Sequence, residues 1–369
     1  MSDQRGLSVH ALEVTFGRNH LLRGIDLDVA RGETLVLFGP SGVGKTVLLR
    51  AVAGLEPAAR GQIIIDGRDV TTRGPDARGL GMAFQNFALY PHMSARDNIA
   101  SPLVARGVAR EERERRVGAV ADLLRIAHVL GHAPRELSNG QKQRTALARA
   151  LIGAPGVLLL DDPLRNVDAK LRYEMRLELP RLLRNAGAAT LYVTQDYREA
   201  MALGDRVAIL LDGTIAQLAA PEDIYDRPAS RAVARLFGDP PINLLACRPT
   251  DGAGGVQVTA AGLRRVLTAD RGAIGRECLL GLRPDAIDVH AQPRPGAAPA
   301  ELVATTPLHE RLVVLLRSAG GEEVVASVLG AVPAPGSQVW FSAETAHAAL
   351  FDAASGARIA AAAPIMEAA

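Results

Sequence analysis

Three short apolar runs predict buried β-strands in the N-terminal part of the chain. They occupy residues 35–38, 157–160 and 190–194. The second run has no polar position before its two final aspartates, so it suits the middle of a parallel sheet that is covered on both faces. A helical pattern follows the first run. We therefore predict an α/β fold with polar side chains at the carboxyl ends of the strands, where such open sheets bind ligands.

The pattern changes at about residue 242, where short β-like pieces follow one another. Glycine and proline punctuate these pieces, as in small barrels built from short strands. The pieces are residues 256–259, 278–282, 312–316, 324–328 and 339–341. A chain of 369 residues is also long for one core, since a domain holds on the order of 100–200 residues. We predict two domains, residues 1–238 and 242–369.

Composition and charge exclude some classes of protein. Hydrophobic residues make up 48% of the chain and charged residues 22%, as in ordinary globular proteins. The net charge of +2 is too small to indicate a nucleic-acid partner, because such proteins usually carry a clustered basic face. The densest charge run, "REERERR" at 110–116, alternates in sign and predicts a solvated helix face.

The cysteines and the hydropathy of the chain indicate in which cellular compartment the protein lies. Cys247 and Cys278 lie outside any CxxC pair, so we expect neither a zinc site nor a disulfide framework, and free thiols fit a reducing compartment. The stretch "MSDQRGLSVH" carries an acid and has no apolar core, so we expect no signal peptide. No uncharged apolar run reaches about 18 residues, so we expect a cytosolic protein that reaches a membrane only through a partner.

A phosphate loop follows the first apolar run. Residues 39–46 read "GPSGVGKT", which fits the GxxxxGK[ST] pattern in its strand, loop and helix context. The glycines let backbone N–H groups turn towards a phosphate, and the helix adds its positive N-terminal end. Lys45 would reach the β- and γ-phosphates, and Thr46 would bind Mg²⁺. The predicted nucleotide contacts are Gly39, Ser41, Gly42, Gly44, Lys45 and Thr46.

Two aspartates end the second apolar run. Asp161 is placed to hold the Mg²⁺ shell, as the aspartate after such a strand does in phosphate-loop NTPases. Asp162 would position or deprotonate the attacking water. The alternative, in which Asp162 only caps the next helix, stays open at this point. A phosphate loop alone does not choose among kinases, GTPases, helicases and transport ATPases.

A second motif lies between the phosphate loop and the aspartates, where the chain is longer than one βα crossover needs. The inserted segment ends in "LSNGQKQRTALARAL" at 137–151. Ser138 and the N–H groups of Asn139 and Gly140 predict another anion site at a helix start. With Gln141, this stretch resembles the LSGGQ signature of ATP-binding cassette (ABC) proteins.

The resemblance to ABC proteins runs along most of the chain and implies further roles. Gln85, in "AFQNFALYPHMSARDNIASPL" at 83–103, would be a ligand of the metal and the water, and the residues after it would receive a membrane subunit. Phe16 would stack on adenine, although from the residues alone it could equally be a core strand residue. Asp168, in "DDPLRNVDAKLR", matches the D-loop aspartate.

The segment at 200–247 is similar to the end of the cassette in the carbohydrate-uptake branch of ABC importers, which includes the maltose and glycerol-3-phosphate systems. The implied fold is an α/β phosphate-loop NTPase core with an antiparallel β subdomain and a helical insert at about 86–153. A small C-terminal β-barrel of the OB-like, TOBE type would follow, since 280–289 and 349–359 resemble its landmarks.

The resemblance also implies cofactors and partners. The chain would bind ATP and Mg²⁺ and lie peripherally on the cytoplasmic face of the inner (plasma) membrane. Its partners would be permease subunits, a second ATPase subunit, identical or nonidentical, and indirectly an extracytoplasmic solute-binding protein. The branch favours a sugar, polyol or sugar phosphate as solute, although polyamine, metal and anion importers use similar ATPases. The single cassette argues against a soluble ABC protein outside transport, and the signature argues against a phosphate-loop kinase.

Departures from the family pattern fall on the hydrolysis step. Gln195, after the third apolar run, stands where the family has a histidine, and Asp162 stands where it has a glutamate. Glutamine cannot carry a proton, aspartate is one methylene shorter, and a displacement of about 1 Å can cost on the order of 10² in rate. We expect weakened hydrolysis with intact binding, in a slow homodimer or beside a fully active second cassette. Arg165, where the family has a serine, has no role that the sequence predicts.

Overall fold

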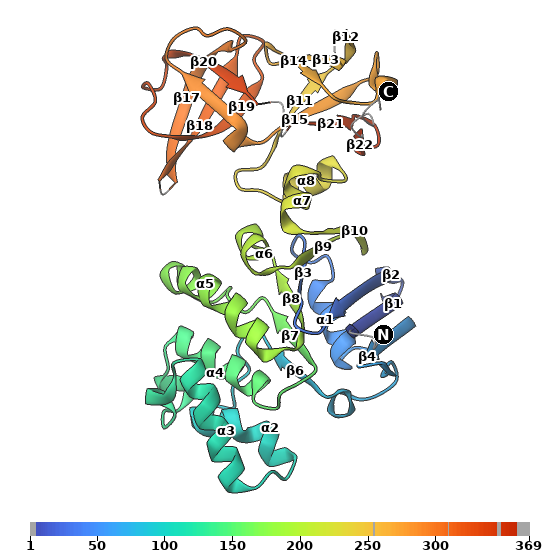
Figure 1. The fold of residues 1–369 in the computed structure, drawn as a ribbon, viewed down its shortest axis with the longest axis vertical. Helices are drawn as coiled ribbons and strands as arrows, with labels where there is room; N and C mark the ends of the chain where they lie inside the picture. Colours follow the sequence, from blue (N-terminus) through green and yellow to red (C-terminus); the bar gives the residue numbers. More distant parts are fainter. Residues whose placement is uncertain (1–4, 254, 309, 345–347, 360–369) are drawn as a thin grey trace, which may run out of the picture. The chain divides into compact units, whose positions relative to one another are not determined.

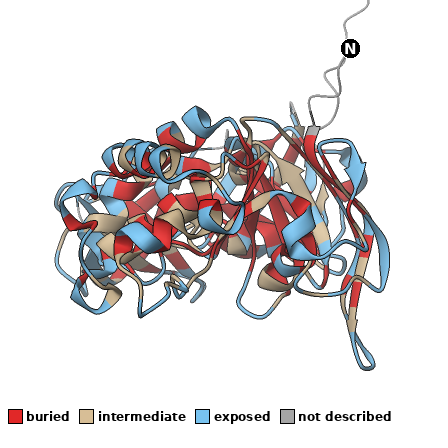
Figure 2. Cartoon of the chain, turned by 90° about the horizontal axis from the view of Figure 1, so that it is seen from below, coloured by how far each residue is buried: buried red, intermediate tan, exposed pale blue. Residues whose placement is uncertain are grey.

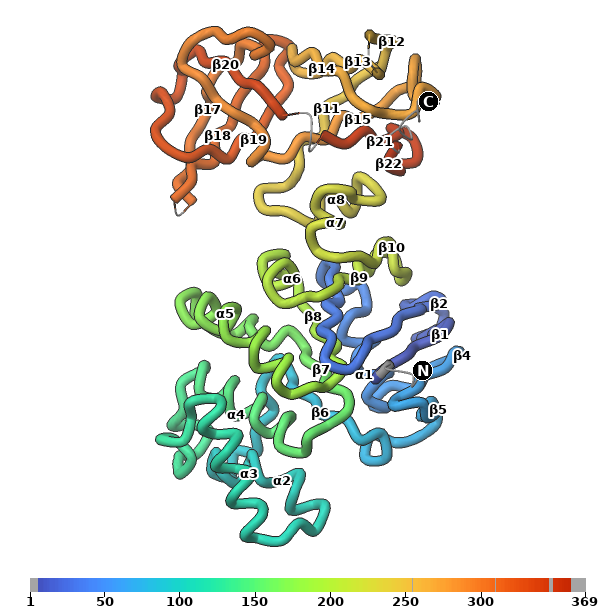
Figure 3. The backbone as a smooth tube through the Cα atoms, in the orientation of Figure 1, coloured from blue at the N-terminus to red at the C-terminus, as the bar shows by residue number. Residues whose placement is uncertain are grey.

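The chain forms two compact units, residues 1–221 and 222–369 (Figure 1). The computed structural model describes residues 5–253, 255–308, 310–344 and 348–359. Figure 3 traces the path by colour, from the blue strands of the first unit to the red strands of the second. Each unit has its own hydrophobic core, as separate domains require.

A six-stranded sheet forms the centre of the first unit, in the order β10-β9-β3-β8-β7-β6. Strands from β9 to β6 are parallel, and β10 is antiparallel to β9. The strands are β3 (Thr34–Phe38), β6 (Leu80–Ala83), β7 (Val157–Asp161), β8 (Ala189–Thr194), β9 (Arg206–Leu211) and β10 (Thr214–Ala219). Every residue of β3, β7 and β8 is buried, which confirms the three predicted strands. Figure 2 colours the buried residues of the chain red. Because these strands are parallel, their carboxyl ends meet at one edge of the sheet.

An antiparallel sheet in the order β2-β1-β4-β5 shares the core of the first unit. It comprises β1 (Arg5–Phe16), β2 (Asn19–Ala30), β4 (Arg60–Ile65) and β5 (Arg68–Asp69). Helix α1 (Lys45–Ala53) buries Leu48, Leu49 and Val52 in that same core. The helix that follows the phosphate loop is therefore anchored to strands of both sheets.

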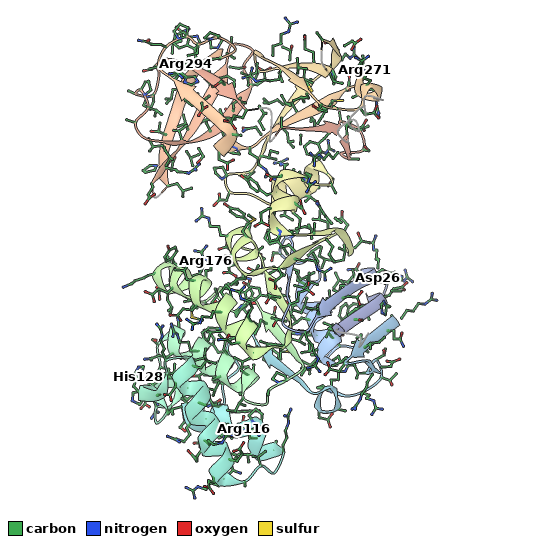
Figure 4. All side chains as sticks on the ribbon, in the orientation of Figure 1. Asp26, Arg116, His128, Arg176, Arg271 and Arg294 are labelled. Atoms are coloured by element: carbon green, nitrogen blue, oxygen red, sulfur yellow. The ribbon has the colours of Figure 1, made fainter. Side chains whose placement is uncertain are left out.

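Helices between β6 and β7 form the inserted segment. They are α2 (Ala95–Ala105), α3 (Arg110–Leu123) and α4 (Asn139–Leu151), and the other helices of this unit are α5 (Ala169–Ala186) and α6 (Tyr197–Leu203), with 3₁₀ turns at Pro75–Arg78, Ala127–Val129 and Pro134–Glu136. The charge run lies on α3, where Glu112 pairs with Arg115 and with Arg116, which is labelled in Figure 4. No residue of the run is buried, as predicted. Among the described helices, none is long and apolar enough to cross a membrane.

Strands dominate the second unit. They form sheets in the orders β11-β15-β21-β22, β12-β13-β14 and β16-β20-β17-β18-β19. The strands are β11 (Asn243–Cys247), β12 (Thr250–Gly252), β13 (Gly255–Ala260), β14 (Leu263–Leu267), β15 (Cys278–Leu282), β16 (Ile287–His290), β17 (Ala298–Leu308), β18 (Arg311–Ser318), β19 (Glu323–Leu329), β20 (Gln338–Ala343), β21 (Ala349–Asp352) and β22 (Arg358–Ile359). The helices are α7 (Pro221–Asp226) and α8 (Arg231–Leu236), with 3₁₀ turns at Arg271–Ala273 and Pro284–Ala286. The five predicted β pieces coincide with β13, β15, β18, β19 and β20, which confirms a β-rich C-terminal domain.

Arg283 ties α7 and α8 to the strands of the second unit. Its side chain is fully buried, and Nη1 donates to the carbonyls of Ala234 (3.0 Å) and Phe237 (2.8 Å). Its Nη2 donates to the carbonyl of Tyr225 (2.7 Å), whose ring centre lies 4.0 Å from the guanidinium. Residues 222–238 therefore pack with the second unit, whereas the sequence assigns them to the end of the cassette. The predicted domain limits at 238 and 242 stay a proposal.

Candidate functional site

The phosphate loop connects β3 to α1 at the carboxyl edge of the central sheet. Gly44 caps α1 with a φ of +110°, and Gly42 has a φ of +80°, in a region that side chains rarely adopt. A Cβ on Gly39 would lie only 2.5 Å from the carbonyl oxygen of Leu210. The backbone path therefore requires these glycines, and the unpaired N–H groups of the first turn of α1 follow directly on the loop.

The Lys45 side chain is buried within the loop. Its Nζ donates to the carbonyls of Gly39 (2.8 Å) and Pro40 (2.7 Å). Burial lowers the pKa of Lys45, and the carboxylates of Asp162 and Asp161 oppose that effect. An ammonium group has three N–H donors, so one donor remains for a phosphate bound by the loop.

Thr46 and Asp161 bring two oxygen atoms together at the end of β7. The Thr46 hydroxyl donates to Oδ1 of Asp161 over 3.0 Å. Burial raises the pKa of Asp161, and the hydrogen bond from Thr46 opposes that effect. Hydroxyl and carboxylate oxygens suit Mg²⁺, which usually takes only one or two carboxylates and completes its shell with phosphate and water. The residues present therefore fit the predicted Mg²⁺ ion.

Asp162 follows β7 in a left-handed backbone conformation. Its φ is +43°, and its N–H donates to the carbonyl of Val193 on the neighbouring strand (2.9 Å). Helix α5 is capped instead by Asp168, whose carboxylate accepts from the Leu171 N–H (3.0 Å). The helix-cap alternative for Asp162 is therefore wrong. Burial raises the pKa of Asp162 to about 6, and the nearby Arg165 partly offsets that effect.

One cavity of about 290 Å³ collects these groups. Its lining comprises Leu21, Ser41, Gly42, Gly44, Lys45, Thr46, Val47, Gln85, Asp161, Asp162, Arg165, Val193 and Gln195. Gln195 follows β8, is exposed, and has no hydrogen-bond partner for its amide among the described residues. The structure thus brings together the loop, both aspartates, Gln85 and Gln195, which the sequence predicts as one site.

Arg165 joins this cavity without having been predicted there. Its Nη1 lies 3.7 Å from Oδ2 of Asp162, and its side chain is 51% exposed. The turn after β7 brings the two together, because the Arg165 N–H donates to the Asp162 carbonyl over 3.2 Å. The sequence does contain a signal for this contact, because Arg165 lies three positions after Asp162 and a single turn brings residues at that spacing together.

Phe16 is the last residue of β1 and is 45% exposed. That exposure excludes the alternative in which Phe16 is a core strand residue. It pairs with Asn19 across the β1–β2 hairpin. The base-platform role that the resemblance implies stays a prediction.

The signature residues lie at the start of α4. Ser138 is the N-cap, whose hydroxyl accepts from the Gln141 N–H (3.3 Å), while Oε1 of Gln141 accepts from the Ser138 N–H (2.9 Å). This reciprocal capping box sets the helix start. A Cβ on Gly140 would lie 1.9 Å from the end of the Leu171 side chain, so a larger residue at this position would require that side chain to move. None of these three signature residues is among the described residues that line the phosphate-loop cavity.

The segment after β6 is fastened to α4 and to the turn after β7. Arg149 of α4 donates from Nη1 to the Ala88 carbonyl (2.8 Å) and from Nη2 to the Phe87 carbonyl (3.1 Å). Phe87 and Ala88 have φ values of +64° and +47°, so these bonds hold a strained backbone. Asn166 donates from Nδ2 to the Gln85 carbonyl (2.9 Å). A displacement of this segment would therefore reach both α4 and the turn that carries the aspartates.

A groove of about 510 Å³ lies beside this segment. Its lining comprises Leu80, Gly81, Met82, Phe84, Ala88, Tyr90, Ser101, Pro102, Ala105, Arg106, Arg149, Ala150, Gly153 and Pro155. These residues come from β6, the segment after it, α2, and the end of α4 with the turn that follows. Tyr90 is 46% exposed there, and the Arg149 guanidinium lies 5.5 Å from its ring centre.

Both units of this chain contain a region that matches a known protein family. The sequence pattern of the family described as "ABC transporter" matches residues 22–165, and that of the TOBE domain matches residues 280–351. An sn-glycerol-3-phosphate import ATP-binding protein of Rhizobium johnstonii is 43% identical over 308 residues, which is 83% of this chain and 82% of the relative. One of Burkholderia thailandensis is 45% identical over 291 residues, 78% of this chain and 79% of the relative. The chain belongs to the ABC transporter family, as an ATPase that continues into a TOBE domain.

Proposed function

We propose that this chain hydrolyses ATP to drive the import of a sugar phosphate, with glycerol 3-phosphate as the first candidate. The observation that carries the proposal is the cavity in which Lys45, Thr46, Asp161 and Asp162 meet at the edge of the central sheet. The solute is suggested by the relatives, which are named as sn-glycerol-3-phosphate import ATP-binding proteins. Other sugars and polyols follow next, and polyamines, metals and anions are more distant alternatives.

The loop binds the phosphates of ATP. Backbone N–H groups of residues 41–46, at the end of the loop and the start of α1, donate to the phosphate oxygens, and Lys45 adds its free side-chain donor. Thr46 and Asp161, with Gln85, would hold Mg²⁺, which would supply positive charge to the phosphate groups. Phe16 stacks on the adenine base.

Hydrolysis transfers the γ-phosphoryl group to water. The water oxygen forms a bond to the γ-phosphorus while the bond between that phosphorus and the bridging oxygen of ADP breaks. Asp162 orients the water and accepts its proton, and Gln195 donates from its amide to a γ-phosphate oxygen. Because aspartate reaches one methylene less far than glutamate, and glutamine carries no proton, this step is slow.

The groove beside Arg149 is the proposed docking surface for a permease subunit at the cytoplasmic face of the membrane. Its lining combines apolar side chains with two arginines and an exposed tyrosine, as suits a partner helix. Arg149 and Asn166 link the groove to α4 and to the turn after β7. Nucleotide-dependent movement at the cavity can therefore reach the permease, and through it, indirectly, the solute-binding protein.

A second ATPase subunit completes the site. Ser138, Gly140 and Gln141 lie at a helix start outside the cavity of their own chain. In ABC proteins two cassettes face each other head to tail, and membership of that family implies that these residues serve the cavity of a second cassette. That subunit is either a copy of this chain or a nonidentical partner with a fully equipped site. The intact mass of the complex, purified from native membranes on a tag placed on this chain, separates these two arrangements.

Transport into proteoliposomes tests the proposed function. The chain is purified with its permease and reconstituted, and the uptake of radiolabelled glycerol 3-phosphate is measured with ATP and with the solute-binding protein. We expect ATP-dependent uptake that Lys45→Ala abolishes. Uptake of a different solute would reassign the substrate, and undiminished ATP-dependent uptake by the Lys45→Ala variant would refute the assignment of the phosphate site.

A further inference from the structure

Two cationic side chains line the phosphate-loop cavity within the described part of the chain, Lys45 and Arg165. Lys45 stands at the start of α1, whereas Arg165 lies on the turn after β7, beside Asp162. Two loop carbonyls accept hydrogen bonds from the Lys45 ammonium. Arg165 has a different environment, and more of its N–H donors are free to bind a ligand than those of Lys45.

The backbone of Arg165 is fixed, while its guanidinium is not. The N–H donates to the Asp162 carbonyl (3.2 Å), and the carbonyl accepts from Nη2 of Arg172 (3.3 Å). The guanidinium approaches Oδ2 of Asp162 only to 3.7 Å, which is beyond hydrogen-bond distance, and finds no other acceptor among the described residues. A guanidinium has five N–H donors and stays charged at physiological pH. Several donors are therefore available at the wall of the cavity.

A phosphate group is the acceptor that suits these donors. The planar guanidinium can bind two phosphate oxygens at once, and such charge-assisted bonds are stronger than neutral ones. Asp161 and Asp162 would face the γ-phosphate with like charge, which a cation on the same turn offsets. Gln195, which follows the neighbouring strand β8, adds no charge. Since the loop and Lys45 hold the β-phosphate, the group that extends towards Asp162 and Arg165 is the γ-phosphate.

We propose that Arg165 binds the γ-phosphate of ATP within the same chain and bridges it to Asp162, so that the cavity favours ATP over ADP. This inference rests on the proposed ATPase function and adds a residue to it. Arg165 then sets the affinity for the triphosphate and positions the Asp162 carboxylate.

The opposite role for the same contact is a restraint. In that case Arg165 holds the Asp162 carboxylate away from the attacking water. Removing the guanidinium would then accelerate hydrolysis and leave nucleotide affinity unchanged. The two roles predict effects of different kind, so one set of measurements separates them.

Nucleotide affinity of the full-length chain is the test. Dissociation constants for AMP-PNP, a nonhydrolysable ATP analogue, and for ADP are measured by calorimetry with Mg²⁺, at protein concentrations where sedimentation gives a monomer. We expect Arg165→Ser to weaken AMP-PNP binding about tenfold, as for one solvent-exposed charge-assisted hydrogen bond, and ADP binding less than about twofold. Arg165→Lys should recover part of the loss, because it keeps the charge but not the planar fork.

Arg181→Ser is the matched control, because Arg181 is an exposed arginine of α5 outside the cavity lining, and both affinities should stay unchanged. Equal weakening of AMP-PNP and ADP by Arg165→Ser, or no weakening of either, would overturn the proposal. A rise in kcat at unchanged AMP-PNP affinity would establish the restraint instead. A wild-type chain that binds neither nucleotide would refute the ATPase assignment itself, and that result differs from any selective effect of Arg165→Ser.

Discussion

Arg165 in the first unit and Arg283 in the second unit are two arginines in contrasting surroundings. Arg283 is 2% exposed, and its guanidinium donates to three backbone carbonyls beside an aromatic ring. Arg165 is half exposed and has a single carboxylate at 3.7 Å. A buried charge whose donors are used inside the protein holds a fold together, whereas one whose donors remain available at a cavity points to a ligand.

Two amide side chains repeat the contrast. Asn243 donates from Nδ2 to the carbonyls of Leu282 (3.1 Å) and Val325 (2.8 Å), and its Oδ1 accepts from the Val325 N–H (2.7 Å). Gln195 makes no side-chain hydrogen bond to any described residue and lines the phosphate-loop cavity. Asn243 thus fixes β-strands of the second unit, whereas the Gln195 amide at the sheet edge of the first unit is left for nucleotide.

The largest expected effect is the loss of stability when Arg283, the structural arginine of the pair, is replaced. Arg283→Met removes the guanidinium that donates to the carbonyls of Tyr225, Ala234 and Phe237, so we expect it to lower the free energy of unfolding of the second unit by about 4 kcal/mol. Arg165→Met should change the unfolding free energy by less than about 1 kcal/mol, because its ion pair is exposed. In urea titrations, Trp340 on β20, the single tryptophan of the chain, reports the second unit, and the circular dichroism of the helices reports mainly the first unit. Similar losses for the two variants would contradict the contrast.

A smaller effect concerns Glu199, which is buried on α6 but is also hydrogen bonded. It accepts from the Tyr192 hydroxyl (2.8 Å) and the Thr194 hydroxyl (2.9 Å), yet burial dominates and raises its pKa from 4.5 to about 7. Between these values the folded protein holds a proton that the unfolded chain releases, so stability should fall as the pH rises through this window.

Glu199→Gln should remove that dependence. The shift corresponds to roughly 3 kcal/mol of unfolding free energy lost by the wild type between pH 4.5 and 8, as an upper figure. Urea titrations followed by the circular dichroism of the helices, at several pH values, give the slope for both proteins. Parallel slopes for wild type and variant would show that Glu199 does not titrate in this range.

The smallest expected effect concerns the rate of ATP hydrolysis at the phosphate-loop cavity. Asp162→Glu combined with Gln195→His restores the reach and the proton-carrying side chain that the family pattern has. We expect kcat for ATP hydrolysis to rise about tenfold or more, with little change in KM, because both changes act on the chemical step. Phosphate release by the chain purified with its permease measures the rate. An unchanged kcat would mean that another feature, with Arg165 the first to examine, limits hydrolysis.

Much of the first unit could be predicted because its signals are local. The apolar runs of β3, β7 and β8, the phosphate loop and the capped start of α4 each occupy one stretch of sequence and form as expected. The convergence of Asp162 and Gln195 follows from parallel strand order alone.

Other features depend on contacts that the sequence does not display. Arg283 binds Tyr225 across 58 positions of sequence, so the packing of α7 and α8 with the second unit was not predicted. Whether Asp162 caps the next helix depended on where α5 begins, and the structure begins α5 after Asp168. Arg165 was visible as an unusual residue, but its place in the cavity required the path of the turn after β7.

The most direct test of the account is single-turnover ATP hydrolysis by the chain in complex with its permease, compared between wild type and Asp162→Asn. We propose that the Asp162 carboxylate activates the attacking water in this cavity. Asparagine has nearly the size of aspartate but lacks the negative charge. We predict a loss of about 10² or more in the hydrolysis rate with ATP affinity unchanged, as for removal of a general base. Hydrolysis at the wild-type rate in the Asp162→Asn complex would contradict the account.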